Sequence, residues 1–173
     1  MTILPHAALD AMHASKCELA GEVLRSTGKL RLQVTGWSML PTVMPGETLV
    51  VESFGDGEVS QEVSRGDIVL FRRDGRLFAH RVVATPSGSG LDQIVTRGDG
   101  MLHADSPLAA SDVLGKVSCI LRNGRSRKPP VRLSLSQRAV AAAVRRFDSA
   151  ARFLVGIHQL RHSSKETSIT CQN

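Results

Sequence analysis

Cysteine is scarce in this chain and is not arranged for a structural role. The 173 residues include three cysteines, Cys17, Cys119 and Cys171, which are widely spaced and form no Cys-x-x-Cys pair. This odd and scattered set indicates neither a structural zinc site nor a disulfide framework. We therefore expect free thiols that are buried or chemically inert.

Long apolar runs are missing from the N-terminal part of the chain. Residues 1–35 contain no run near the roughly twenty apolar residues with which a helix crosses a bilayer. Residues 1–10 lack the basic start and the continuous apolar centre of a secretory signal. We therefore expect a cytoplasmic protein without a transmembrane span.

Acidic residues become rare towards the C-terminus. Residues 1–121 contain 11 Lys and Arg against 14 Asp and Glu, whereas residues 122–173 contain 11 against 2. The formal net charge of +6 therefore comes entirely from the tail. At this change of composition, the basic and turn-rich run from Arg122 to Pro130 predicts an extended linker.

The chain does contain the pattern of a mainly β domain, with enough hydrophobic residues, 42%, for one buried core. Before Gly28, which can end a helix, apolar residues recur at helical intervals. They are Leu9, Met12, Leu19, Val23 and Leu24. Four segments alternate apolar and polar side chains as strands do, and they span residues 30–35, 48–53, 67–71 and 77–83. Turns are predicted at residues 55–57 and 87–90.

A second helix is predicted after the linker, capped by Ser136 and running from residue 137 to residue 160. Arginines occupy much of its polar surface, and its apolar stripe consists of Val140, Val144, Phe147, Ala151, Leu154 and Ile157. Such a helix can dock on the core, adsorb to an anionic membrane, or attract nucleic acid, for which no recognised motif is present. Residues 163–173 are expected to be disordered.

Ser38 lies in a segment suited to a presented nucleophile. A serine hydroxyl attacks a carbonyl only when a base removes its proton and donors stabilise the resulting oxyanion. In Gly36-Trp37-Ser38-Met39-Leu40-Pro41, glycine permits unusual backbone angles and proline disfavours a helical conformation before it. Histidine suits the role of base, and His80, in Ala79-His80-Arg81-Val82-Val83, is the candidate.

These two motifs, with further ones that follow the family's order along the chain, resemble the signal peptidase I family. The histidine resembles the branch of that family whose base is histidine, as in the archaeal and endoplasmic reticulum enzymes. Ser38-Met39-Leu40-Pro41, followed by Pro45-Gly46-Glu47, is similar to the family's motif around the catalytic serine, called the serine box. Glu47 stands where the family usually has aspartate. His80-Arg81-Val82 stands where bacterial leader peptidases carry Lys-Arg-Val. The other similar segments are 65–71, 96–99 with Asp105, and 113–117. The resemblance spans residues 30–121.

The resemblance implies a role for each matching residue. Ser38 would be the nucleophile, His80 the general base and later the acid, and Asp105 or Asp99 the carboxylate that orients the imidazole, with Asp105 preferred. It also implies the complex β-fold shared by signal peptidases and LexA-like proteins. The implied substrate has small side chains near the cleaved bond and binds extended beside an edge strand, and no cofactor is needed.

The chain departs from the family pattern around the serine and before it. Many members carry a hydroxyl residue two positions before the nucleophile, where Gly36 stands here. Trp37 replaces the customary small residue, and the usual membrane-spanning helix before the serine box is missing. Neither Lys29 nor Lys116 stands where a catalytic lysine of the family would. A metal site at Asp99, His103 and Asp105 is disfavoured, because such oxygen-rich loops are common turns.

The sequence therefore predicts four parts. They are an N-terminal helical segment (1–29), a peptidase-like β core (30–121), a basic linker (122–135), and a C-terminal amphipathic helix with a flexible tail (136–173). The predicted activity is that of a serine endopeptidase acting on a precursor or regulatory protein. A peripheral contact of the tail with the inner membrane face is left open, and nucleic acid is disfavoured. Two alternatives remain: a LexA-like regulator that cleaves itself, with Ala20-Gly21 as the conceivable bond, and a catalytically silent peptide-binding module.

Overall fold

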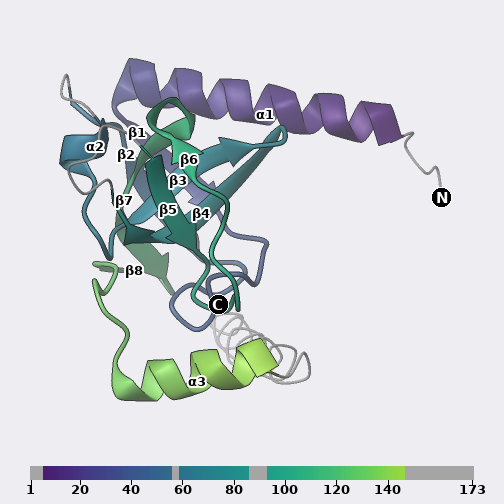
Figure 1. Cartoon of the computed structure of the whole chain (residues 1–173). Coiled ribbons are helices and arrows are strands. Elements are labelled where there is room, and N and C mark those ends of the chain that lie inside the picture. The colour runs from purple at the N-terminus through teal and green to yellow at the C-terminus, as the bar shows by residue number, and fades with distance from the viewer. Residues whose placement is uncertain (1–5, 56–58, 86–92, 147–173) are drawn as a thin grey trace, which may run out of the picture.

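The computed structural model describes residues 6–55, 59–85 and 93–146. Strands dominate this part of the chain, with α1 across the top and α3 at the bottom of Figure 1. In chain order, the elements are α1 (His6–Thr27), β1 (Lys29–Gln33), β2 (Thr48–Glu52), α2 (Val59–Glu62), β3 (Ile68–Arg73), β4 (Arg76–Ala84), β5 (Gln93–Arg97), β6 (Leu108–Ala109), η1 (Ala110–Asp112), β7 (Val113–Arg122), β8 (Arg125–Arg127) and α3 (Leu135–Arg146). The predicted fold class, a mainly β core with an N-terminal and a C-terminal helix, is confirmed.

The strands form an antiparallel sheet in the order β1-β2-β7-β3-β4-β5-β6, with β8 paired to β7. The four strands expected between residues 30 and 83 are present, with their ends shifted by one or two residues. The long β7 lies between β2 and β3 and so joins the N-terminal hairpin to the strands that follow it.

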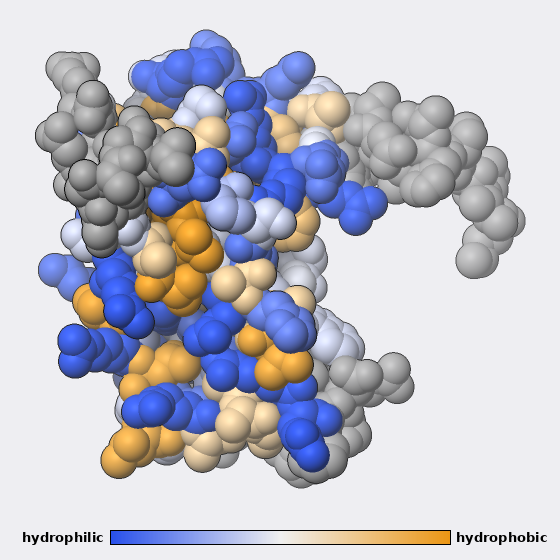
Figure 2. Space-filling view, in the orientation of Figure 1, coloured by the Kyte–Doolittle hydropathy of each residue, from blue (hydrophilic) through white to orange (hydrophobic). Residues whose placement is uncertain are grey.

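The sheet carries a hydrophobic core on each face. Successive side chains of a strand point to opposite faces, and β3 buries four in a row, Ile68 to Phe71. Ile68 and Leu70 belong to one core with Leu24 of α1, while Val69 and Phe71 belong to the other. On the face shown in Figure 2, apolar residues form separate patches among hydrophilic ones.

Helix α1 packs on the sheet through a face that includes the predicted Leu24 but not the predicted Leu19. Cys17, Ala20 and Leu24 are buried, whereas Leu19, assigned to the apolar stripe, is 64% exposed. The buried positions still follow helical spacing, because residues three and four apart share a face. The Gly28 amide donates to the carbonyl of Leu24 (2.9 Å), which ends the helix where the sequence predicted.

The two described cysteines are free thiols. Cys17, a residue of α1, is buried, and burial raises the pKa of its thiol above the ordinary value. Cys119 is half-buried on β7 beside the Ser126 hydroxyl. Cys171 lies outside the described residues.

The segment expected to be an extended linker begins as a hairpin. β8 pairs with β7 in the register Arg122 opposite Arg125. Asn123 and Gly124 form the turn with positive φ angles of 51° and 73°. Asn-Gly is the preferred pair for this two-residue turn because both residues tolerate the left-handed conformation. The Asn123-Gly124 pair is therefore a local sequence signal for this hairpin.

Helix α3 begins earlier than predicted and docks on the core. Its cap is Ser134 instead of Ser136, since the Ser134 hydroxyl accepts from the Gln137 amide (3.2 Å) and the Gln137 side chain accepts from the Ser134 amide (3.0 Å). Val144 is buried against Leu40, with Val140 and Met44 beside them. The predicted extension to residue 160, the loop at 87–90 and the disordered end at 163–173 lie outside the described residues. No described helix is long and apolar enough to cross a membrane.

The docking of α3 is testable by hydrogen exchange. We expect Val144→Asp to abolish protection of the α3 amides while leaving β3 and β7 protected, because a carboxylate cannot be buried against Leu40 without a partner. Ala143→Asp adds the same charge at the neighbouring exposed position and serves as the control. Equal protection of α3 in the two variants would contradict the docked arrangement.

Candidate active site

Ser38 lies on a tight turn between β1 and β2. The turn is closed by hydrogen bonds from the Leu40 amide to the Trp37 carbonyl (3.1 Å) and from the Val43 amide to the Met39 carbonyl (3.0 Å). The side chains of Met39, Leu40 and Val43 are buried and attach the turn to the core. Ser38 itself is half-buried at the surface, beside the partly exposed Trp37. The expected bend after a strand is therefore present.

His80 comes from the middle of β4. The residue is 5% exposed, and its ring packs edge-on against Phe71, at 5.7 Å between ring centroids, and at a tilt against Phe78, at 5.9 Å. These aromatic contacts restrict the rotation of the imidazole. Because side chains alternate along a strand, Arg81 points to the other side of β4.

The His80 imidazole bridges Ser38 and Asp105. Its Nε2 lies 2.9 Å from the Ser38 Oγ, and its Nδ1 lies 2.7 Å from the Asp105 Oδ2. Since a carboxylate accepts, we assign the ring proton to Nδ1, which leaves Nε2 to accept the hydroxyl proton of Ser38. The three side chains come from the serine turn, β4 and the loop after β5.

Thr96 holds the Asp105 carboxylate in position to accept from His80. The Thr96 hydroxyl donates to the Asp105 carboxylate (2.7 Å), and the Asp105 amide donates to the Thr96 carbonyl (2.8 Å). Burial alone would raise the pKa of the Asp105 carboxyl, but hydrogen bonds from His80 and Thr96, with the charges of His80 and Arg73, hold it below its ordinary value. The carboxylate is therefore ionised at neutral pH and can stabilise a charged imidazolium.

Asp99, the other carboxylate considered for His80, contacts Arg81 instead. Both of its oxygens accept from the Arg81 guanidinium at 2.8 Å, and the Thr42 hydroxyl donates to the same carboxylate. Arg81 and Asp99 are 8% and 3% exposed. Arg81 also donates to the carbonyls of Gly66 and Pro130, so all of its nitrogens are used. Sequence reasoning missed Thr42 and Arg81 as parts of the site.

The loop that carries Asp99 packs directly on the serine turn. The Gly100 amide donates to the Ser38 carbonyl at 2.8 Å. A Cβ atom at Gly98 would lie 2.5 Å from that same carbonyl oxygen, closer than atoms can approach, so only glycine fits there. The loop after β5 thus supports the serine turn through backbone contact.

Glu47 and Lys116 lie away from the reacting groups. The buried Glu47 carboxylate pairs with Arg122 and accepts from the Met44 amide (3.0 Å), which fixes the far end of the serine turn. Lys116 Nζ contacts the Glu62 carbonyl (3.3 Å) and Asp67 (3.5 Å). This placement lends no support to a Ser-Lys pair. Among the described residues, no cluster of three or more His, Cys, Asp or Glu is arranged to hold a metal ion.

The fold and the site together present a hydrogen-bonded serine, histidine and aspartate on a mainly antiparallel sheet. The family model described as Peptidase S24-like matches residues 5–91, half of the chain, and the chain belongs to this family. The match includes Ser38 and His80 and ends before Asp99 and Asp105. A comparison with curated proteins finds no match. The family also includes members without catalytic activity, so membership alone does not establish turnover.

Two conservative substitutions distinguish the roles of the Asp105 and Asp99 carboxylates. We expect Asp105→Asn to lower turnover by about 10⁴-fold with little loss of stability, because an amide at that position favours the wrong imidazole tautomer. Asp99→Asn should instead lower the free energy of unfolding by about 3–5 kcal/mol, because it leaves the buried Arg81 charge without its partner. Denaturant unfolding and peptide cleavage measured on both variants check this. Similar unfolding losses in the two would contradict the assignment.

Proposed function

We propose that the protein is a serine endopeptidase of the Ser-His type, similar to the histidine branch of signal peptidase I. The observation that carries this proposal is the continuous chain of hydrogen bonds from Ser38 through His80 to Asp105. A buried histidine held between a serine and a carboxylate is what nucleophilic attack by serine requires. The family match supports a peptidase fold but does not identify the base. The proposal that His80 is the base rests on its hydrogen bond to Ser38.

The mechanism uses each side chain in turn. His80 Nε2 takes the Ser38 proton as Oγ attacks the substrate carbonyl, and Asp105 stabilises the imidazolium that results. His80 then gives this proton to the leaving amine, and an acyl-enzyme remains on Oγ. Water, deprotonated by the same imidazole, releases the acyl group and regenerates the serine.

The oxyanion needs donors that the side chains around Ser38 do not supply. Gly36, two positions before the serine, has no side chain, and the space beside its Cα is open. Within the described residues, the Ser38 amide makes no backbone hydrogen bond. We assign this amide as one oxyanion donor, since an uncommitted N–H beside the nucleophile can point at the developing charge.

The substrate is proposed to be an extended segment of another protein. β1 is the terminal strand in the described sheet order and ends five residues before Ser38, so its outer edge can pair with a peptide strand. Trp37, Met101 and Leu102 are exposed to 44%, 46% and 63%, and lie on the serine turn and on the loop packed against it. They offer apolar contacts to side chains near the cleaved bond.

Cleavage of another chain is favoured over self-cleavage at Ala20-Gly21. This pair lies inside α1, where Ala20 is 6% exposed and packs toward the sheet. A peptide bond must be extended and accessible to enter a peptidase site, and a buried helical bond is neither. The LexA-like alternative therefore has no support at that bond. A silent peptide-binding module remains the alternative to a peptidase.

The peptidase proposal is tested by labelling and cleavage. Wild-type protein should react with a serine-directed phosphonate and cleave members of a peptide library, whereas Ser38→Ala should do neither and keep its fold. Ser111→Ala, at an exposed serine away from the site, is the control that should behave as wild type. Peptide binding by unlabelled wild type would favour the silent module, and equal cleavage by Ser38→Ala would end the proposal.

A second variant tests the oxyanion assignment. Gly36→Ser restores the hydroxyl residue that many signal peptidases carry, in a place with no atom within 4 Å of the new Cβ. We expect kcat to rise, by up to about tenfold, with KM little changed, because the added donor acts on charge present only in the transition state. Gly36→Ala is the matched control. Equal kcat values for Gly36→Ser and Gly36→Ala would show that the added hydroxyl does not stabilise the oxyanion.

The cellular setting stays a prediction. The described part of α3 uses its apolar side chains against Leu40 and Met44, so membrane adsorption would depend on residues 147–160, outside the described residues. The inner membrane face and the four-part division of the chain are proposed on the sequence pattern alone.

A further inference from the structure

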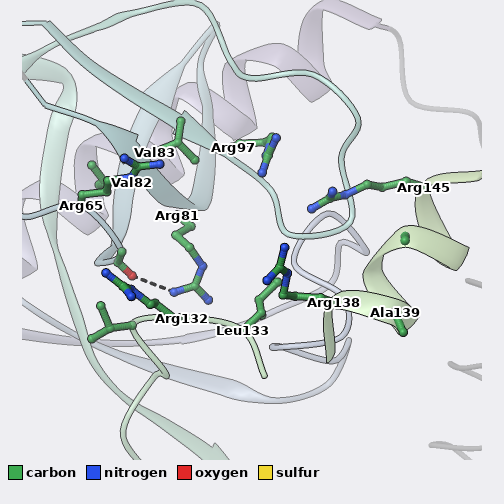
Figure 3. Close-up of a pocket in the computed structure, with 13 residues that line it drawn as sticks. Arg65, Arg81, Val82, Val83, Arg97, Arg132, Leu133, Arg138, Ala139 and Arg145 are labelled. Carbon is green, nitrogen blue, oxygen red and sulfur yellow. Dashed lines mark hydrogen bonds between the residues drawn. The ribbon is translucent and has the colours of Figure 1, made fainter. Parts of the chain in front are cut away.

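An arginine-lined cleft lies between the sheet and α3. It encloses about 900 Å³, and the described residues that line it include neither an acidic nor an aromatic side chain. Six of them are arginines contributed by β4, β5, α3 and two loops: Arg65, Arg81, Arg97, Arg132, Arg138 and Arg145. Figure 3 shows Arg97, Arg138 and Arg145 pointing toward a common space. Ser38, His80 and Asp105 are not part of the lining. The cleft therefore lies apart from the three reacting side chains and shares only Arg81 with the residues that support them.

Among the described residues, few acidic side chains compensate the positive charge of this cleft. Arg81 is neutralised by Asp99 and forms part of the floor. The other five arginines form no ion pair with a described carboxylate, and Arg145 donates only to the Asp99 carbonyl. Burial, and then repulsion by Arg97, lower the pKa of the Arg145 guanidinium, with partial relief from Asp99. Like charges held together in this way favour a bound anion.

The walls of the cleft are fixed by the fold. The connector before α3 passes so close to the turn before β3 that a Cβ at Gly66 would lie 2.6 Å from the Val131 carbonyl oxygen. The Arg81 guanidinium joins the same connector through the Pro130 carbonyl, at 2.6 Å. On the other side, Val144 docks α3 against Leu40. A site built this way exists before the ligand arrives, so little ordering opposes binding.

The chemistry of the lining selects the kind of anion. Guanidinium groups form paired hydrogen bonds with phosphate oxygens, and several together match an anion of high charge density. The volume fits a small molecule. The lack of aromatic side chains disfavours stacking of single-stranded bases, and a concave cleft admits a duplex or a flat lipid surface only at its rim. We propose that this cleft binds a compact soluble anion with two or more linked phosphate groups.

The test is calorimetric titration of the full chain with inorganic tripolyphosphate. Wild type should bind one equivalent, more weakly as salt is raised. Arg97→Gln combined with Arg138→Gln should lower the affinity by at least tenfold, the effect of losing charge-assisted hydrogen bonds. The matched control combines Arg125→Gln with Arg146→Gln, which removes two exposed arginines outside the lining. Circular dichroism and the Tm without ligand check that both variants are folded.

The outcomes separate the proposal from its rivals. Loss of affinity confined to the cleft variant supports it, whatever the result of the peptidase experiments. Equal affinity in wild type and the cleft variant, or an equal loss in the control, overturns it. Duplex DNA or phosphatidylglycerol vesicles are added in separate titrations. If either binds through Arg97 and Arg138 and is not displaced by tripolyphosphate, the cleft belongs to that partner and the proposal fails.

Discussion

The buried ion pair between Arg81 and Asp99 is the interaction on which the rest of the site depends. It joins β4 to the loop after β5, and Thr42 extends the connection to the serine turn. Burying two charges is costly, so such a pair is a poor source of net stability. Its role here is to fix positions, because each buried charge is stable only where it contacts the other. The turn, the loop and the strand are thereby held in one arrangement.

This arrangement places chemistry on both sides of β4. On one side, His80 lies between Ser38 and Asp105 with its ring held by aromatic neighbours. On the other side, Arg81 forms part of the floor of the arginine-lined cleft. Adjacent residues of one strand therefore serve two sites, and strand alternation accounts for their separation. Asp99 contacts two arginines of the cleft, Arg81 through its carboxylate and Arg145 through its carbonyl.

Much of this could be predicted from the sequence, and the failures have physical causes. Strand alternation and the ordered motifs predicted the mainly β fold and named Ser38 and His80. They preferred Asp105 to Asp99 only through the family resemblance, because both residues follow β5 in one loop and only the path of that loop decides which carboxylate reaches the imidazole. Leu19 was misassigned because helical periodicity does not say which face meets the sheet. The convergence of arginines from distant elements has no local signal at all.

The most direct measurement of the central claim is the tautomer of the His80 imidazole. The ¹⁵N chemical shifts of histidine-labelled protein at neutral pH report it, with the resonance assigned by its loss in His80→Gln. The account predicts a neutral ring with its proton on Nδ1, facing Asp105, and a bare Nε2 that accepts from Ser38. A neutral ring with its proton on Nε2 would contradict it, because His80 could not then take the serine proton.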